Sequence, residues 1–182
     1  MDYLKSHEEL ISYKKFLSWK RKNVTLRGMK DRYAEDNGGM AKYGQGLYTA
    51  FLGNMSMSKQ YGQVYYLLGA IPKHPKVVNN TNDAEIFMWK IMDDYCKKNN
   101  TNYDKWDQTF FYKNTSISKE MQNLGYDGLV IKGREMVNYT PSDNIKYFEN
   151  LRQLQKYYDD FIKGETLKEP KQVSDLYHFT NF

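Results

Sequence analysis

The order of helical and strand-like segments constrains the fold of this 182-residue chain more than any other feature of its sequence. Apolar residues that recur every three or four positions favour helices, and short runs rich in β-branched or aromatic residues favour strands. Helices and strands do not alternate one by one, as they would in βαβ units, so the order predicts an α+β fold with a mixed or mostly antiparallel sheet. The expected helices cover 7–21, 56–61, 118–124, 149–162 and a stretch from 82, and the expected strands cover 24–26, 47–50, 64–71, 129–131, 136–139 and 145–148.

The length of the chain and its hydrophobic content of 40% predict one domain with one core. No run of about 18 apolar residues is present, so we expect no membrane span. We expect a single domain over 1–163, in which a helix at 7–21 and a helix at 149–162 flank a core at about 23–150. Residues 164–182 are expected to be a tail or linker, or the start of a further domain.

The cysteine and histidine content of the chain limits the disulfides and metal sites that it can form. The single cysteine, Cys96, excludes an internal disulfide and fits a reducing, cytoplasmic setting, which is the host cytoplasm if a phage encodes the chain. The three histidines, His7, His74 and His178, lack the spacing of metal ligands, so we expect no metal.

The formal net charge of +5 favours an anionic partner, such as a nucleic acid or a phosphate-rich ligand. The alternative is a surface rich in lysine, because the lysines are interleaved with acids and form no continuous basic stripe in the sequence.

Three segments place a polar residue at the end of a short strand. In Leu26-Arg27-Gly28, an arginine offers a planar fork for phosphate or carboxylate, and the glycine lets a ligand approach the backbone. A surface arginine followed by a turn glycine is the alternative interpretation.

The second segment, residues 43–62, reads YGQGLYTAFLGNMSMSKQYG. Its first two glycines permit close approach of the backbone, and Tyr48 and Thr49 alternate across an expected strand. Ser58 and Tyr61 lie one helical turn apart, so a hydroxyl and a ring on one face could bind and stack a planar ring that bears an amide. Turn glycines and core tyrosines are the alternative.

The third segment is Gly133-Arg134-Glu135-Met136-Val137. Glu135 begins an apolar strand, where an acid is poorly placed unless it faces a cleft. A carboxylate in such a cleft can hold a hydroxyl and stabilise an oxocarbenium-like centre. A solvated glutamate at a strand start is the alternative.

In order and spacing, these segments resemble the motifs of ADP-ribosyltransferases. Leu26-Arg27-Gly28 is similar to the first motif, GQGLYTA to the GxGxYFA element of the PARP and diphtheria-toxin-like branch, and SKQY at 58–61 to the Ser-x-x-Tyr that follows it. The strand that starts at Glu135 resembles the one with the catalytic glutamate, and YDGLV at 126–130 resembles a strand of small phage and bacterial members. The resemblance covers roughly 23–150 and implies two small mixed or antiparallel sheets that form a NAD cleft flanked by helices.

The resemblance also implies roles for single residues. The backbone of Gly28 and the hydroxyl of Ser58 would bind the nicotinamide amide, and the ring would lie between Tyr61 and Tyr48. Arg27 would grip the ribose or pyrophosphate, and Glu135 would hold the ribose 2′-hydroxyl and stabilise the cation left as nicotinamide departs. The catalytic candidates are therefore Glu135 and Arg27, and the NAD-binding candidates are Arg27, Gly28, Tyr48, Thr49, Ser58 and Tyr61.

The chain departs from the family's patterns in three places. Its second strand reads Tyr48-Thr49-Ala50, where the arginine-modifying branch usually carries Ser-Thr-Ser. Arg27 stands where PARPs carry histidine, which argues against synthesis of long polymers. Gly133 stands two positions before Glu135, where the arginine-modifying branch carries an acid, so an arginine acceptor is not expected.

We therefore expect a monomeric mono-ADP-ribosyltransferase of phage or toxin type, with NAD as its substrate and a host protein or nucleic acid as acceptor. A NAD glycohydrolase on the same fold, and a non-catalytic nucleic-acid-binding or virion module, are the alternatives. Leu176-Tyr177-His178-Phe179-Thr180 is similar to the histidine form of the first motif. That segment could be a tail, the start of a second related domain, or a permuted element that completes the site.

Overall fold

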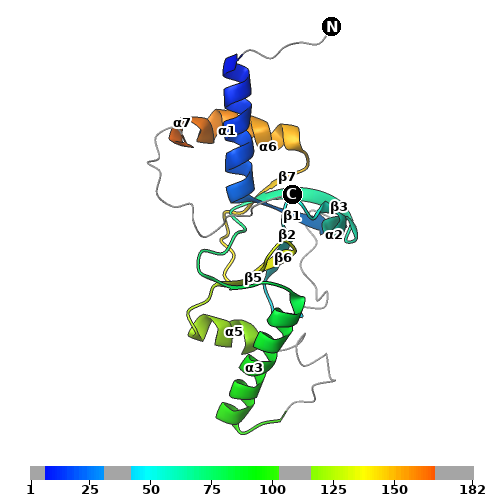
Figure 1. Cartoon of the computed structure of the whole chain (residues 1–182), viewed down its shortest axis with the longest axis vertical. Helices are drawn as coiled ribbons and strands as arrows, with labels where there is room; N and C mark the ends of the chain where they lie inside the picture. The colour runs from blue at the N-terminus through cyan, green and yellow to red at the C-terminus, as the bar shows by residue number, and fades with distance from the viewer. Residues whose placement is uncertain (1–6, 31–41, 103–115, 167–182) are drawn as a thin grey trace.

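The computed structural model describes residues 7–30, 42–102 and 116–166 and has an α+β fold, which confirms the expected class (Figure 1). Its helices are α1 (His7–Asn23), α2 (Met55–Lys59), α3 (Thr81–Asn99), α5 (Ser116–Asn123), α6 (Leu151–Tyr157), a π-helix (Tyr158–Ile162) and α7 (Lys163–Thr166). Its strands are β1 (Val24–Met29), β2 (Leu47–Ala50), β3 (Gln63–Leu68), β4 (Pro75–Val78), β5 (Gly128–Ile131), β6 (Glu135–Asn138) and β7 (Lys146–Phe148).

The strands form one seven-stranded sheet in the order β4-β5-β6-β2-β1-β3-β7. All neighbours pair antiparallel except β4 and β5, so the sheet is mixed, as expected. It is a single sheet rather than the two small sheets that the resemblance implied. The reason is that β1, which pairs along its whole length with β3, also pairs with β2 through Leu26 and Ala50. Within the described chain, this one residue pair joins the two halves of the sheet.

Two groups of helices cover the two halves. Figure 1 shows α1, α6 and α7 at one end of the molecule, α3 and α5 at the other, and the sheet between them. The first helical cluster joins α1 and the C-terminal helices to β1 and β7, and the second joins α3 and α5 to β4, β5 and β6. Buried members of the first are Phe16, Trp19, Val24, Phe148, Leu154 and Tyr158, and those of the second include Val78, Met88, Ile91, Met92, Ile117, Met121, Leu129, Ile131 and Val137.

Several elements differ in length from the expectation. β1 does not end at Arg27-Gly28 but continues to Met29, because Gly28 pairs with Val64 of β3. β4 differs from the expectation, because the sequence Pro72-Lys73-His74-Pro75 predicts the end of a strand and not the start of another. Pro75 is tolerated as the first residue of an edge strand, where no N–H is needed for the ladder.

Helix ends also differ in detail. α2 begins after Asn54, not after a serine, and the Asn54 side chain makes no capping bond. α3 begins one residue before the expected helix, because the side chain of Asn80 accepts a hydrogen bond from the backbone N–H of Asp83 at 2.9 Å. The expected helix 149–162 begins at Leu151 and continues through the π-helix and α7 to Thr166. The segment around His178 lies outside the described residues.

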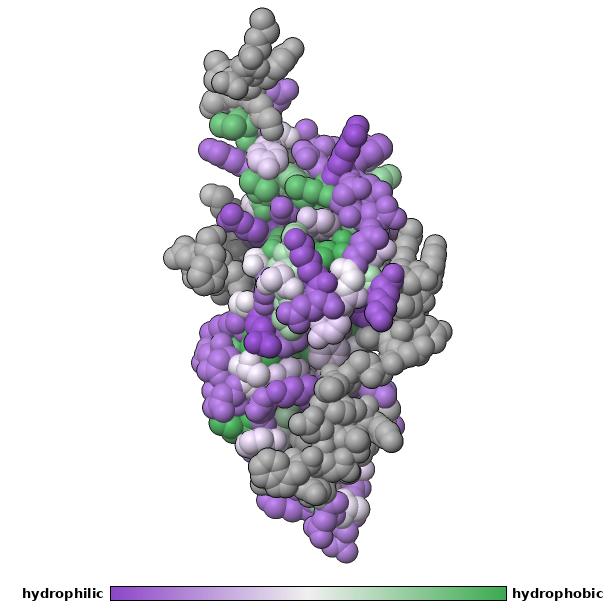
Figure 2. All heavy atoms as spheres, turned by 90° about the vertical axis from the view of Figure 1, so that its right-hand side faces the viewer, coloured by the Kyte–Doolittle hydropathy of each residue, from purple (hydrophilic) through white to green (hydrophobic). Residues whose placement is uncertain are grey.

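The face drawn in Figure 2 is mostly hydrophilic, with small hydrophobic groups toward the end of the molecule that carries α1. Exposed apolar side chains at that end include Leu10, Ile11 and Phe161. Within the described ranges, no helix combines the length and the apolar character needed to cross a bilayer.

Candidate active site

Glu135 is the first residue of β6 and lies in the middle of the sheet. It pairs with Ala50 of β2 and Ile131 of β5, and Ala50 pairs in turn with Leu26 of β1. Directly opposite residues of antiparallel strands direct their side chains to the same face, so Glu135 shares a row with three apolar side chains. Only 8% of Glu135 is exposed to solvent. The structure therefore places this acid in a largely apolar environment.

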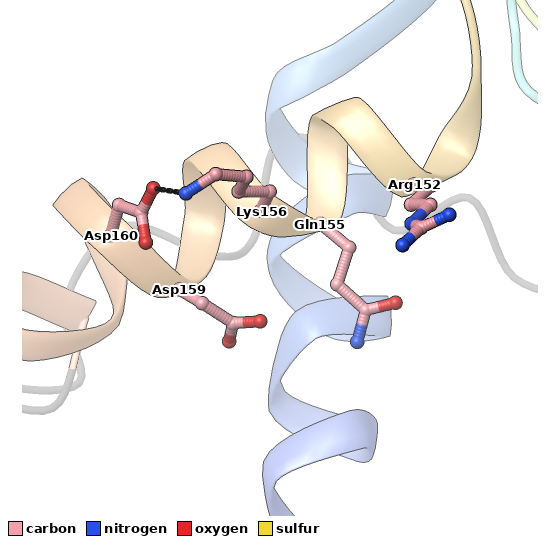
Figure 3. Close-up of a pocket in the computed structure, with 5 residues that line it drawn as sticks. All are labelled: Arg152, Gln155, Lys156, Asp159 and Asp160. Atoms are coloured by element: carbon pink, nitrogen blue, oxygen red, sulfur yellow. Dashed lines mark hydrogen bonds and ion pairs between the residues drawn. The ribbon is translucent and has the colours of Figure 1, made fainter.

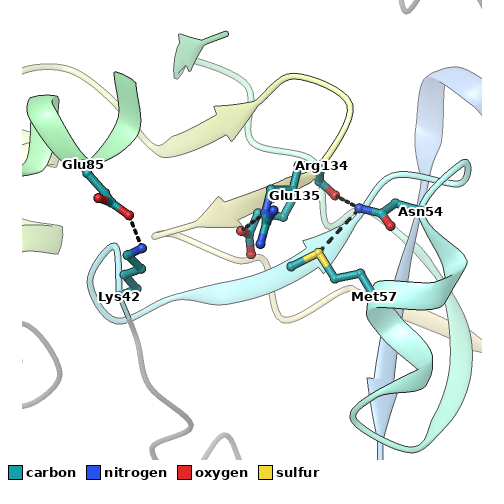
Figure 4. A network of polar contacts seen from close by, with 6 residues as sticks. All are labelled: Lys42, Asn54, Met57, Glu85, Arg134 and Glu135. Carbon is teal, nitrogen blue, oxygen red and sulfur yellow. Dashed lines mark hydrogen bonds and ion pairs between the residues drawn. The ribbon is translucent and has the colours of Figure 1, made fainter. Parts of the chain in front are cut away.

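One arginine compensates the buried carboxylate directly. Arg134 Nε donates a hydrogen bond to Glu135 Oε1 at 3.2 Å (Figure 4). Burial raises the pKa of Glu135 above its usual 4.5, and the charges of Arg134 and Lys42 oppose this rise without cancelling it. Lys42 also forms an ion pair with Glu85 of α3. A buried acid with a raised pKa and a partly exposed cationic partner is typical of functional sites and also of structural ion pairs.

α2 packs directly on the backbone of β1. A Cβ added at Gly28 would lie 1.7 Å from the carbonyl oxygen of Ser58 and 3.2 Å from Tyr61 Cβ, so only glycine allows this contact. Ser58 is buried, whereas Tyr61 is 60% exposed and its ring is open to solvent. The structure therefore brings together Gly28, Ser58 and Tyr61, which come from the first and second sequence motifs.

The start of α2 is tied to the turn before Glu135. Asn54 Nδ2 donates a hydrogen bond to the backbone carbonyl of Arg134 at 3.2 Å, as Figure 4 shows. Asn54 and Arg134 are 80 positions apart in the sequence. α2 thus contacts β1 through Ser58 and the β5–β6 turn through Asn54, so all three predicted segments meet around α2 and the end of β2.

Arg27 and Thr49 do not join this cluster. They stand next to Leu26 and Ala50, and successive residues of a strand direct their side chains to opposite faces. Since Leu26 and Ala50 share the face of Glu135, Arg27 and Thr49 point to the other face. Thr49 Oγ1 is buried there and has no hydrogen-bond partner within the part of the chain that is described.

Tyr48 is engaged within the protein. Its hydroxyl donates to the carbonyl of Gly44 at 2.7 Å and accepts from the N–H of Tyr43 at 2.9 Å. The hydroxyl of Tyr139 donates to the carbonyl of Tyr43 at 2.7 Å. Burial raises the pKa of Tyr48 and Tyr139 above the usual value for tyrosine. These two side chains hold the loop before β2, which accounts for Tyr48 without a ligand.

Four residues near Glu135 are not predicted as functional by any sequence motif: Asn54, Lys42, Tyr43 and Arg134. Burial raises the pKa of Tyr43 to about 12, with further contributions from Glu135 and Glu85. Of these four, only Arg134 could have been predicted from the sequence, because a buried acid needs a cationic partner and Arg134 directly precedes Glu135. Lys42, Tyr43 and Asn54 are more than 80 positions from Glu135, and no sequence pattern links them to it.

A shallow hollow of about 300 Å³ lies elsewhere, on α6 and the π-helix (Figure 3). It is lined by Arg152, Gln155, Lys156, Asp159 and Asp160, and the ion pair from Lys156 Nζ to Asp160 Oδ2 spans 2.5 Å. These are exposed polar groups of one helical surface, and none comes from the segments around Glu135. In the described ranges, no group of three or more His, Cys, Asp or Glu residues is placed to hold a metal ion.

Comparison of the chain with protein-family models, curated proteins and solved structures gives no match.

Proposed function

We propose that the chain is a mono-ADP-ribosyltransferase with an ADP-ribosyltransferase-like fold, which cleaves NAD at the nicotinamide–ribose bond and transfers ADP-ribose to a protein or nucleic acid. One observation carries the proposal: α2 packs on Gly28 through Ser58 and is bonded through Asn54 to the turn before Glu135. Three segments that resemble family motifs in sequence order are therefore neighbours in space.

Glu135 is the residue we assign to the chemical step. Its ionised carboxylate would accept a hydrogen bond from the 2′-hydroxyl of the nicotinamide ribose and face the positive charge that develops on the ribose. The bond between the ribose carbon and the nicotinamide nitrogen breaks, and its electron pair leaves with nicotinamide. Because Glu135 lies among apolar side chains, the charge interaction would be stronger than in water. A group of this kind contributes about 10²–10⁴ in rate.

Gly28, Ser58 and Tyr61 are assigned to nicotinamide. The exposed ring of Tyr61 could stack on a planar ligand. The lack of a side chain at Gly28 lets Ser58 pack on β1, and this contact brings Tyr61 next to Gly28. Arg27 points away from the face of Glu135, so we assign it to the pyrophosphate of NAD and not to the bond that breaks. We assign Thr49 to the same side of the sheet as Arg27.

The direct test uses the full chain, NAD labelled in its adenylate part, and cell lysate as a source of acceptors. We expect release of nicotinamide and a labelled macromolecule, and we expect Glu135→Gln to reduce both by at least about 10². Glu120→Gln is the matched control, because Glu120 forms its ion pair with Lys98 on the α3–α5 surface.

Other outcomes separate the alternatives. Nicotinamide release without any labelled macromolecule would identify a NAD glycohydrolase. Absence of both products from the wild-type chain would contradict the proposal. In that case, salt-sensitive binding to DNA or RNA would favour the non-catalytic module, since phosphate contacts have a steep salt dependence.

A further inference from the structure

We propose that Arg134 is a positioning residue, which keeps the Glu135 carboxylate ionised and turned toward the β5–β6 turn. The inference rests on the proposed function in one respect, since Glu135 is there the reacting carboxylate. No sequence motif gave Arg134 a role.

The geometry holds Arg134 at the carboxylate from three directions. Its N–H donates to the carbonyl of Ile131 at 3.1 Å, and its own carbonyl accepts from Asn54 at 3.2 Å. Its Nε then donates to Glu135 Oε1 at 3.2 Å. Because the backbone on which the side chain is mounted is fixed on both sides, the ion pair differs from the loose pairs of exposed surface residues.

The surroundings of Glu135 explain why such a partner is needed. Charged and titratable groups that act on it are Arg134 from the turn, Lys42 from the loop before β2, and Tyr43 and Tyr48. The two residues that pair directly with Glu135, Ala50 and Ile131, are apolar. Lys42 is shared with Glu85, which leaves Arg134 as the main group that favours the charged form.

The arginine is also placed so that it can yield to a ligand. Its side chain is 53% exposed, whereas that of Glu135 is 11% exposed. The guanidinium of Arg134 can therefore turn into solvent or toward an anion, and its own charge stays solvated when it does so. In the proposed reaction, Arg134 would keep the carboxylate ionised before NAD binds and would let the ribose hydroxyl take over part of its contact.

Loss of Arg134 should therefore change the protonation of Glu135. Removal of a cation within hydrogen-bonding distance typically raises the pKa of a carboxyl by about one unit or more. For Arg134→Gln, we expect the acidic limb of the pH profile of NAD cleavage to move to higher pH, with kcat affected more than KM. Arg134→Lys, which keeps the charge but not the planar fork, should restore part of the shift.

The closing experiment follows the Glu135 carboxyl carbon by NMR as a function of pH, in the full chain without NAD. Glu135→Gln identifies the resonance. The series comprises the wild type, Arg134→Gln, Arg134→Lys, and Lys132→Gln as a control from the same turn, whose partner Asn79 lies 2.9 Å away on the β4 side. Circular dichroism checks that each variant is folded.

We expect the titration midpoint of Glu135 to rise in Arg134→Gln and to stay unchanged in Lys132→Gln. In Arg134→Lys, the midpoint should lie between the values for the wild type and for Arg134→Gln. An unchanged midpoint in a folded Arg134→Gln chain would overturn the inference, whatever the chain does with NAD. If Arg134→Gln does not fold, the neutral variant Arg134→Met takes its place, and an unchanged Glu135 midpoint in that folded chain would overturn the inference. A raised midpoint in a chain that cleaves no NAD would support the role of Arg134 and count against the proposed function.

Discussion

At the scale of single residues, Glu135 shows a conflict between stability and chemistry. The sheet around it is apolar, so a neutral side chain would pack there at lower cost than an acid. Instead, the acid Glu135 stands there, paired with Arg134, whose side chain is half exposed to solvent. This combination gives a carboxylate that is poorly solvated and paired with one partly exposed cation, an arrangement that the proposed stabilisation of a cationic intermediate would use.

Stability should therefore depend on pH through Glu135. Because burial raises its pKa above 4.5, its contribution to stability is complete below pH 4.5 and is lost as pH rises through the pKa of the folded chain. Glu135→Gln cannot ionise, so at pH 7–8 its free energy of unfolding should exceed that of the wild type by about 1 kcal/mol. At pH 4 the difference should vanish. Urea unfolding at both pH values measures it, and a variant less stable than the wild type at pH 8 would contradict the argument.

Gly28 offers a second prediction at this scale. An added Cβ would overlap the Ser58 carbonyl, so Gly28→Ala must displace α2 from β1. We expect a loss of about 1–3 kcal/mol in the free energy of unfolding and loss of nicotinamide binding. Gly53→Ala is the control, because among the described residues, apart from the two chain neighbours of Gly53, no heavy atom lies within 4 Å of a Cβ added there. Calorimetry measures both, and equal stability of the two variants would show that α2 does not pack on Gly28 as described.

At the scale of elements, the sequence predicted what depends on local pattern. β2 agrees with the expectation at both ends, and α3 lies where the apolar repeat placed it. α5 begins two residues before and ends one residue before the helix expected at 118–124. β4 was missed because the prolines outweighed Val77-Val78, and its place at the sheet edge, which makes Pro75 acceptable, is a tertiary property.

The candidate site was predictable only in part for the same reason. Glu135 stood out as an acid at the start of an apolar strand, and Ser58 and Tyr61 stood out by their spacing. The direction of the Arg27 side chain depends on the pairing of Leu26 with Ala50, and the contact of Asn54 with Arg134 joins residues 80 positions apart. Neither leaves a trace in local sequence.

α2 is a helix of five residues, too short to be stable alone, so its position must depend on its contacts. Asn54→Ala removes the bond to the Arg134 carbonyl, and we expect a cost of about 1 kcal/mol, faster amide exchange in α2, and a higher KM for NAD. Ser56→Ala is the control, since this residue is exposed and its hydroxyl makes only a long hydrogen bond of 3.4 Å, to Asn54 Oδ1, among the described residues. Equal amide exchange rates of α2 in the two variants would show that Asn54 does not hold α2 in place.

At the scale of the whole molecule, one sheet connects two helical clusters that do not share a buried residue. β2 and β1 join the halves through Leu26 and Ala50, and the candidate site lies along this seam. The relative positions of Glu135 and Gly28 therefore depend on both clusters. Under the proposed function, a substitution in a distant helix would therefore be able to reduce activity without contact to NAD.

If the sheet makes the halves one cooperative unit, a cavity in either cluster should lower the stability of both. Met92→Ala in α3 and Phe16→Ala in α1, both nearly inaccessible to solvent, should each cost about 2–5 kcal/mol. Hydrogen exchange resolved by segment should show α1 and α3 losing protection together in either variant, because unfolding of one half breaks the ladder that supports the other. Ile86→Ala, at a half-exposed position of α3, should leave both unchanged. Loss of protection confined to the mutated half would instead mean that the Leu26–Ala50 seam separates two independently unfolding parts, with the candidate site at their boundary.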